Sequence, residues 1–170
     1  MFLRLLFIFL IFFANSCSKK EEIISIIKEK ELNLQMIDAY KEGIKAFEEG
    51  DSLFAAKKFN EAEILFPQSE WAPKSILMAA YSYYYQDYYW DAISELERFI
   101  KKYPSHERLS YAHFLLAICY YEQIVDEKKD VGPLLNAEKE FKFVVDNYSD
   151  TDFALDAKFK LDLIYDVLAS

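Results

Sequence analysis

The stretch that decides the fold is residues 71–104, WAPKSILMAAYSYYYQDYYWDAISELERFIKKYP, which predicts two helices folded back on each other. Its second half spaces apolar residues three, four and seven positions apart, so they share one helical face. These residues are Ala92, Leu96, Phe99, Ile100 and Tyr103. Pro104 then ends the helix, because proline lacks an amide proton and clashes with the preceding turn. One such hairpin cannot bury its own apolar face, so it requires copies of itself on either side.

Copies of this unit recur along the chain at a spacing of 37 residues, and then of 45 residues. The recurring positions are Gly43, Ala80 and Ala117 in the first helices, Ala55, Ala92 and Ala137 in the second helices, and Pro67, Pro104 and Ser149 after them. The longer spacing places an insertion within residues 123–133. A fourth first helix is predicted to begin after Ser149.

Small residues at fixed steps allow two helices to approach closely, whereas large side chains there would push them apart. The pattern of a small residue, Tyr, Ala, an aromatic residue, Ala and Pro resembles the tetratricopeptide repeat, a pair of antiparallel helices. The resemblance implies an all-α solenoid of three helical hairpins plus a further helix. The expected repeats cover about 34–68, 71–105, 106–150 and, in part, 151–170 of a domain spanning 33–170. The alternative is an irregular helical bundle, but the register holds at many positions in three units.

The first 16 residues are typical of a secretory signal peptide, with Arg4 followed by an uninterrupted apolar run. That run is shorter than the roughly 20 residues that span a bilayer. The alternative is a short membrane anchor that stays attached. Ala14-Asn15-Ser16-Cys17 resembles the lipobox of bacterial lipoproteins, which implies cleavage before Cys17 and lipidation of its thiol. Cleavage without lipidation is the alternative. Ser18 after the cysteine implies sorting to the outer membrane.

Residues 17–32 are expected to form the lipidated Cys17 and a charged, acidic tether that is loose or weakly helical. The chain carries a formal net charge of −9, which argues against nucleic acid and against electrostatic adsorption to anionic lipid. Membrane attachment is therefore assigned to the lipid anchor. Cys119 lies in an apolar stretch and is expected to be a buried, inert thiol.

No catalytic or metal-binding residue is predicted. The three glycines form no phosphate loop, and His106 and His113 have no cysteine or acid at metal-ligand spacing. The carboxylates fall on the outer faces of amphipathic helices, where solvation is the default. We therefore expect neither an enzyme nor a cofactor.

A binding surface is the remaining source of function. The repeat register places the first helices along the concave side, where they predict an aromatic groove with one cation at its edge. The candidate groove residues are Tyr40, Phe47, Lys74, Tyr81, Tyr84, Tyr85, Tyr111, Phe114 and Tyr121. The same register also turns the apolar residues Ile37, Ile44, Leu77 and Ile118 inward. Tyrosine suits a peptide site because it offers rigid apolar area and a hydroxyl group. The alternative is that several of these rings only fill the space between helices.

Residues 40–75, 91–121 and 137–164, together with the lipobox, resemble the BamD (ComL) family of outer-membrane assembly lipoproteins. The resemblance implies a component of the β-barrel assembly (BAM) complex that faces the periplasm. It implies contacts with a BamA-like barrel protein, other assembly lipoproteins and the C-terminal segments of unfolded outer-membrane proteins. Relatives carry about five repeats, so the chain is expected to be shortened. The alternative is a repeat scaffold of another envelope machine, in pilus assembly or cell division.

Overall fold

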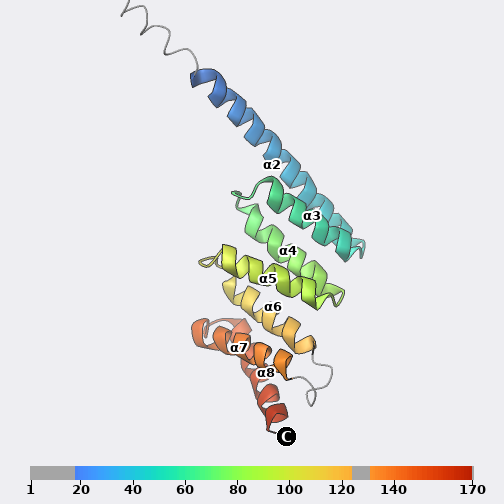
Figure 1. The fold of residues 1–170 in the computed structure, drawn as a ribbon, viewed down its shortest axis with the longest axis vertical. Helices are drawn as coiled ribbons and strands as arrows, with labels where there is room; N and C mark the ends of the chain where they lie inside the picture. The colour runs from blue at the N-terminus through green and yellow to red at the C-terminus, as the bar shows by residue number, and fades with distance from the viewer. Residues whose placement is uncertain (1–17, 124–130, 170) are drawn as a thin grey trace, which may run out of the picture.

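A computed structural model of the protein describes residues 18–123 and 131–169, and it contains seven α-helices and no strand within those ranges (Figure 1). The helices are α2 (Ser18–Glu48), α3 (Ser52–Leu65), α4 (Trp71–Tyr85), α5 (Tyr89–Lys102), α6 (Leu109–Glu122), α7 (Gly132–Asn147) and α8 (Asp152–Leu168). The predicted all-α class is confirmed. The predicted signal peptide, Cys17 and most of the insertion lie outside the described residues.

The helices form antiparallel hairpins that stack in chain order, with α2 paired to α3, α4 to α5 and α6 to α7 (Figure 1). Helix α8 follows α7 and starts the next unit. The predicted register is visible in the core, because residues at equivalent positions of the second helices are all fully buried. Phe59, Leu96 and Phe141 form one such set, and Ala62, Phe99 and Val144 form another. The chain is therefore a stacked array of helical hairpins.

Local chemistry defines the ends of several helices. Gly50 has φ +86°, a left-handed conformation that glycine adopts without a steric penalty, in the turn between α2 and α3. The Asp51 carboxylate then caps α3 by accepting a hydrogen bond from the Phe54 amide at 3.0 Å. Thr151 caps α8 in the same way, and Pro133 occupies the first turn of α7.

Residues 17–32 are expected to form a tether that is loose or weakly helical, and in the structure residues 18–32 are helical, because they belong to α2. This helix runs without a break from Ser18 into the first repeat. Between Ser18 and Glu42 the chain has no glycine or proline and is rich in Lys, Glu, Ile and Leu, most of which favour helices. A polar, charged composition does not by itself indicate a loose chain, because the same residues can extend a helix that the first repeat already forms.

Candidate peptide-binding groove

Two adjoining hollows line the first helices of the stack. The first, of about 370 Å³, is walled by Ile37, Tyr40, Lys41 and Ile44 of α2 and by Trp71 of α4. The second, of about 350 Å³, is walled by Tyr40, Lys74, Leu77, Met78, Tyr81, Arg108 and Tyr111. Tyr40 lines both hollows, so they form one continuous depression, which we call the groove.

Helical periodicity explains why these residues gather. The lining positions are 37, 40, 41 and 44 in α2 and 71, 74, 77, 78 and 81 in α4, and each lies three or four residues from another, which keeps them on one face of each helix. Arg108 lies immediately before α6 and Tyr111 in its first turn, so the third repeat closes one side of the second hollow. Three successive repeats therefore contribute to one site.

Ring contacts hold the wall between the first two repeats. Tyr40 packs edge-on against Trp71 of α4, with centroids 5.0 Å apart, and against the buried Phe59 of α3 at 5.2 Å. The Lys74 ammonium group lies 5.0 Å from the centroid of the Trp71 ring, within the range of a cation–π contact. Burial raises the pKa of the Tyr40 hydroxyl, and the positive charge of Arg108 partly opposes that rise. Tyr40 is therefore a neutral hydrogen-bonding group at physiological pH.

The charge of the groove is opposite to that of the chain. Lys41, Lys74 and Arg108 line it, and no aspartate or glutamate is among the residues that wall either hollow. None of these three cations forms an ion pair within the part of the chain that the structure describes. In a chain with a net charge of −9, three uncompensated cations beside apolar rings favour a ligand that combines an apolar side chain with an anionic group.

Four of the nine predicted residues line the groove, namely Tyr40, Lys74, Tyr81 and Tyr111. Three more form an aromatic cluster beside it: Phe47 packs against Tyr81 at 5.6 Å and Tyr85 at 5.2 Å, and Tyr84 packs against Tyr81 at 6.2 Å.

The remaining two predicted residues, Phe114 and Tyr121, are occupied by other contacts. Phe114 packs against Phe141 at 5.8 Å and against Phe153 at 5.4 Å, and the Lys160 ammonium group covers Tyr121 at 4.4 Å. For these two rings, the alternative of filling the space between helices describes the structure better.

Sequence reasoning missed four lining residues. Lys41 and Met78 stand one position after the predicted inward residues Tyr40 and Leu77, so a wider helical face would have included them. Trp71 was taken only as the start of its repeat. Arg108 lies in the turn before α6, where no periodicity applies, and its place in the groove depends on how the chain folds around Pro104.

Other candidate sites are limited. Across residues 18–123 and 131–169, no cluster of three or more His, Cys, Asp or Glu residues is arranged to hold a metal ion. None of the helices in those ranges combines the length and the apolar content needed to cross a membrane. Cys119 is fully buried, as predicted, and burial raises the pKa of its thiol to about 12.

Comparisons with known proteins agree with this architecture. The family model YfiO, described as "Outer membrane lipoprotein", matches residues 33–170. A protein of Caulobacter vibrioides named "Outer membrane protein assembly factor BamD" is 39% identical over 130 residues, which cover 76% of this chain and 43% of the relative. A protein of Rickettsia prowazekii with the same name is 32% identical over 130 residues, covering 76% of this chain and 52% of the relative. The chain thus spans about half the length of these curated relatives.

Among solved structures, the first tetratricopeptide-repeat domain of Spaghetti (RPAP3), bound to the HSP90 peptide SRMEEVD, superposes with a TM-score of 0.61. It is 17% identical in sequence, and the match covers 81% of this chain and 96% of that one. This similarity concerns the fold, and it confirms that the hairpins of this chain are of the tetratricopeptide-repeat type.

Proposed function

The chain belongs to the YfiO family of outer-membrane lipoproteins, and we propose that it is a component of the β-barrel assembly complex. In this role it assists the insertion of β-barrel proteins into the outer membrane by binding partner and substrate segments on its repeats. The names of the curated relatives support this role over a scaffold for pilus assembly or cell division. The role is that of a non-catalytic binding protein.

The observation that carries the proposal is the groove, with its apolar hollow and its adjoining cationic hollow. The first hollow, between Ile37, Ile44 and Trp71, accommodates a ring or a branched apolar side chain. The second presents Lys74 and Arg108 beside the hydroxyl groups of tyrosines. An extended peptide that ends in an aromatic residue offers both an apolar ring and a free carboxylate. We therefore assign the groove to the C-terminal segments of unfolded outer-membrane proteins.

The remaining parts of the proposal concern location and partners. The protein is attached through a lipidated Cys17 to the outer membrane and faces the periplasm. It contacts a BamA-like barrel protein and other lipoproteins of the assembly complex. The predicted signal peptide, residues 1–16, supports export from the cytoplasm, and membership of the YfiO family supports attachment to the outer membrane.

The groove can be tested by fluorescence, because the chain has two tryptophans and one of them lies in the site. Trp90 is 73% exposed on α5, so Trp90→Phe leaves Trp71 as the only reporter without disturbing the core. A ten-residue peptide that ends in phenylalanine with a free carboxylate is titrated against the same peptide carrying a C-terminal amide. We expect the free acid to bind and to shift Trp71 emission, and the amide to bind more weakly.

Variants locate the binding. Arg108→Gln removes a charged hydrogen-bond donor, which is worth about 1.5–3 kcal/mol, and should weaken binding of the free acid by roughly 10- to 160-fold. Its effect on the amide should be smaller. Tyr111→Ala should weaken the binding of both peptides. Tyr165→Ala, an exposed ring on α8, is the control and should change neither. Absence of binding by the wild type would refute the assignment of the groove.

A further inference from the structure

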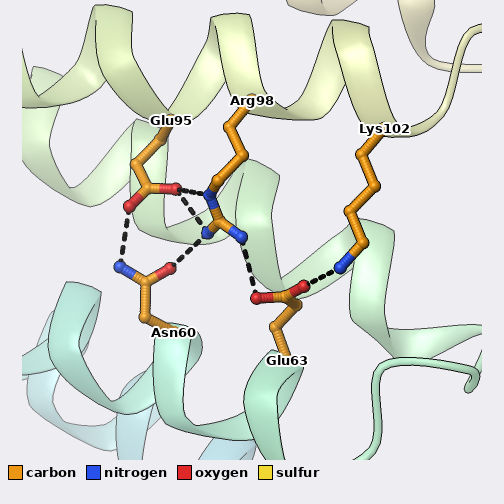
Figure 2. A network of polar contacts seen from close by, with 5 residues as sticks. All are labelled: Asn60, Glu63, Glu95, Arg98 and Lys102. Atoms are coloured by element: carbon orange, nitrogen blue, oxygen red, sulfur yellow. Dashed lines mark hydrogen bonds and ion pairs between the residues drawn. The ribbon is translucent and has the colours of Figure 1, made fainter.

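Five polar side chains join α3 to α5 in a closed network (Figure 2). The Arg98 guanidinium donates to the Glu63 carboxylate at 2.8 Å, to the Asn60 amide oxygen at 2.9 Å and to the Glu95 carboxylate at 2.9 Å. The Asn60 amide nitrogen donates to Glu95 at 2.9 Å, and the Lys102 ammonium group donates to the second oxygen of Glu63. We call this set the strap.

The strap is internally balanced. It contains two carboxylates, Glu63 and Glu95, and two cations, Arg98 and Lys102, so it has no net charge. The Glu63 side chain is only 5% exposed, and each of its oxygens accepts a hydrogen bond from a cation. A buried carboxylate that lost one partner would be left poorly compensated. The side chains of the strap therefore hold one another, and with them α3 and α5, in one arrangement.

The strap occurs at one junction and not at the next. In the repeat register, Glu97 and Ile100 of α5 stand where α3 has Asn60 and Glu63, and α7 has Phe143 where α5 has Arg98. No equivalent network is formed between α5 and α7 by the residues that the structure describes. Glu97 instead accepts from the Tyr120 hydroxyl, at 3.1 Å. The polar link is thus specific to the step from the first repeat to the second.

That step also shapes the groove. Helices α3 and α5 are the second helices of the two repeats whose first helices, α2 and α4, carry most of the groove wall. In a stacked array each repeat is positioned by its neighbours, so fixing α3 against α5 also fixes α2 against α4. From this geometry we infer that Glu63 and Arg98 are positioning residues, which set the spacing of α2 and α4 and so keep the groove open for its ligand.

The first test needs no ligand. In the Trp90→Phe background, Trp71 packs against Tyr40 across the α2–α4 junction, so its emission and its quenching by acrylamide report the spacing. Glu63→Gln removes the charge while keeping the shape of the side chain. We expect faster quenching and red-shifted emission. The matched control is Glu140→Gln, because the Glu140 side chain is 13% exposed and pairs with His113 inside the third repeat at 2.7 Å. It should leave Trp71 unchanged.

The second test rests on the proposed function and uses the same phenylalanine-terminated peptide. Neither Glu63 nor Arg98 lines the groove. Even so, Glu63→Gln and Arg98→Met should each lower the affinity for the peptide by about two- to thirtyfold, the range typical of indirect coupling. Glu140→Gln should bind as the wild type does. Circular dichroism is the check that each variant is folded. If Glu63→Gln unfolds, Arg98→Met tests the same contact.

The outcomes separate the two ideas. If the wild type fails to bind the peptide, the proposed ligand is wrong, while the Trp71 measurement still decides the role of the strap. If Glu63→Gln and Arg98→Met lower the stability but leave Trp71 quenching and peptide affinity at wild-type values, the strap is only a stabilising contact and the inference is overturned.

Discussion

Replacing Gly43 by alanine should lower the stability of the wild type but raise the stability of a variant with a smaller side chain at position 59. Gly43 lies inside α2 against α3, and an ideal Cβ built there would stand 2.8 Å from both Cδ1 and Cε1 of Phe59. Phe59 is fully buried, and Tyr40 packs on its ring at 5.2 Å, so the ring has little room to move away. The contact is shorter than a Cβ tolerates, so the two helices or the ring must shift.

Two opposing effects set the magnitude. Alanine is favoured over glycine in a helix interior by about 1 kcal/mol. Overpacking a tight core costs about 1–3 kcal/mol. Gly43→Ala should therefore destabilise the wild type by roughly 0–2 kcal/mol, with the contact outweighing the propensity. In a Phe59→Leu background Cε1 and Cζ, two of the three ring atoms nearest the new methyl group, are gone, and the leucine Cδ atoms can rotate away from it. The same substitution should then stabilise the protein by up to about 1 kcal/mol.

Urea unfolding of the four proteins in this cycle measures the effect, with the midpoint and the slope fitted together so that a change of slope is recognised. The cycle measures the coupling free energy between positions 43 and 59. Because these residues are in contact, we expect a coupling of at least about 0.5 kcal/mol. Stabilisation of the wild type by Gly43→Ala would refute the reasoning, because it would mean that the helices are not in close contact here. Equal destabilisation in both backgrounds would also refute it.

Three further outcomes are expected. Burial alone would raise the pKa of Glu63, but hydrogen bonds from Lys102 and Arg98 outweigh it and hold that pKa below its ordinary value of 4.5. The stability that the Glu63 charge contributes is therefore complete above about pH 4.5 and lost as the pH falls through the lower folded pKa, so urea midpoints of Glu63→Gln and wild type should converge in acid. Cys119, with a thiol pKa of about 12, should resist iodoacetamide at pH 8 in the folded protein and react once urea unfolds it. Mass spectrometry records the modification, and equal rates in both states would contradict the burial of this thiol. Asp51→Ala should cost about 0.5–2 kcal/mol of unfolding free energy in urea titrations, because the α3 cap is lost, whereas Asp51→Asn should cost less; equal losses would argue against the cap.

Much of the fold could be predicted because it depends on local periodicity. The small residues at positions 43, 80 and 117 and the stop at Pro104 determine helix pairs without knowledge of tertiary contacts. The same periodicity predicted Tyr40, Lys74 and Tyr81, because residues three or four positions apart lie on the same face of a helix. It could not find Arg108, which reaches the groove from a turn.

The errors have a common physical cause. Phe114 faces inward in the register of its own helix, but Phe153 of the next unit covers it, and only tertiary packing shows that. Residues 18–32 have the composition of a tether, but a helix started by the first repeat continues through them because nothing in their sequence stops it. In both cases a neighbouring element decided the outcome, and a local pattern carries no information about its neighbours.

The unbroken α2 has a mechanical consequence. At 1.5 Å per residue its 31 residues form a rod about 46 Å long, and the groove residues Tyr40 and Ile44 stand on the same rod as Ser18. A rod transmits both tilt and twist, whereas a coil would absorb them. Removing a single residue ahead of Met36 would rotate everything before the deletion by about 100° around the axis. The direction in which the groove faces is therefore coupled, turn by turn, to whatever holds the beginning of this helix.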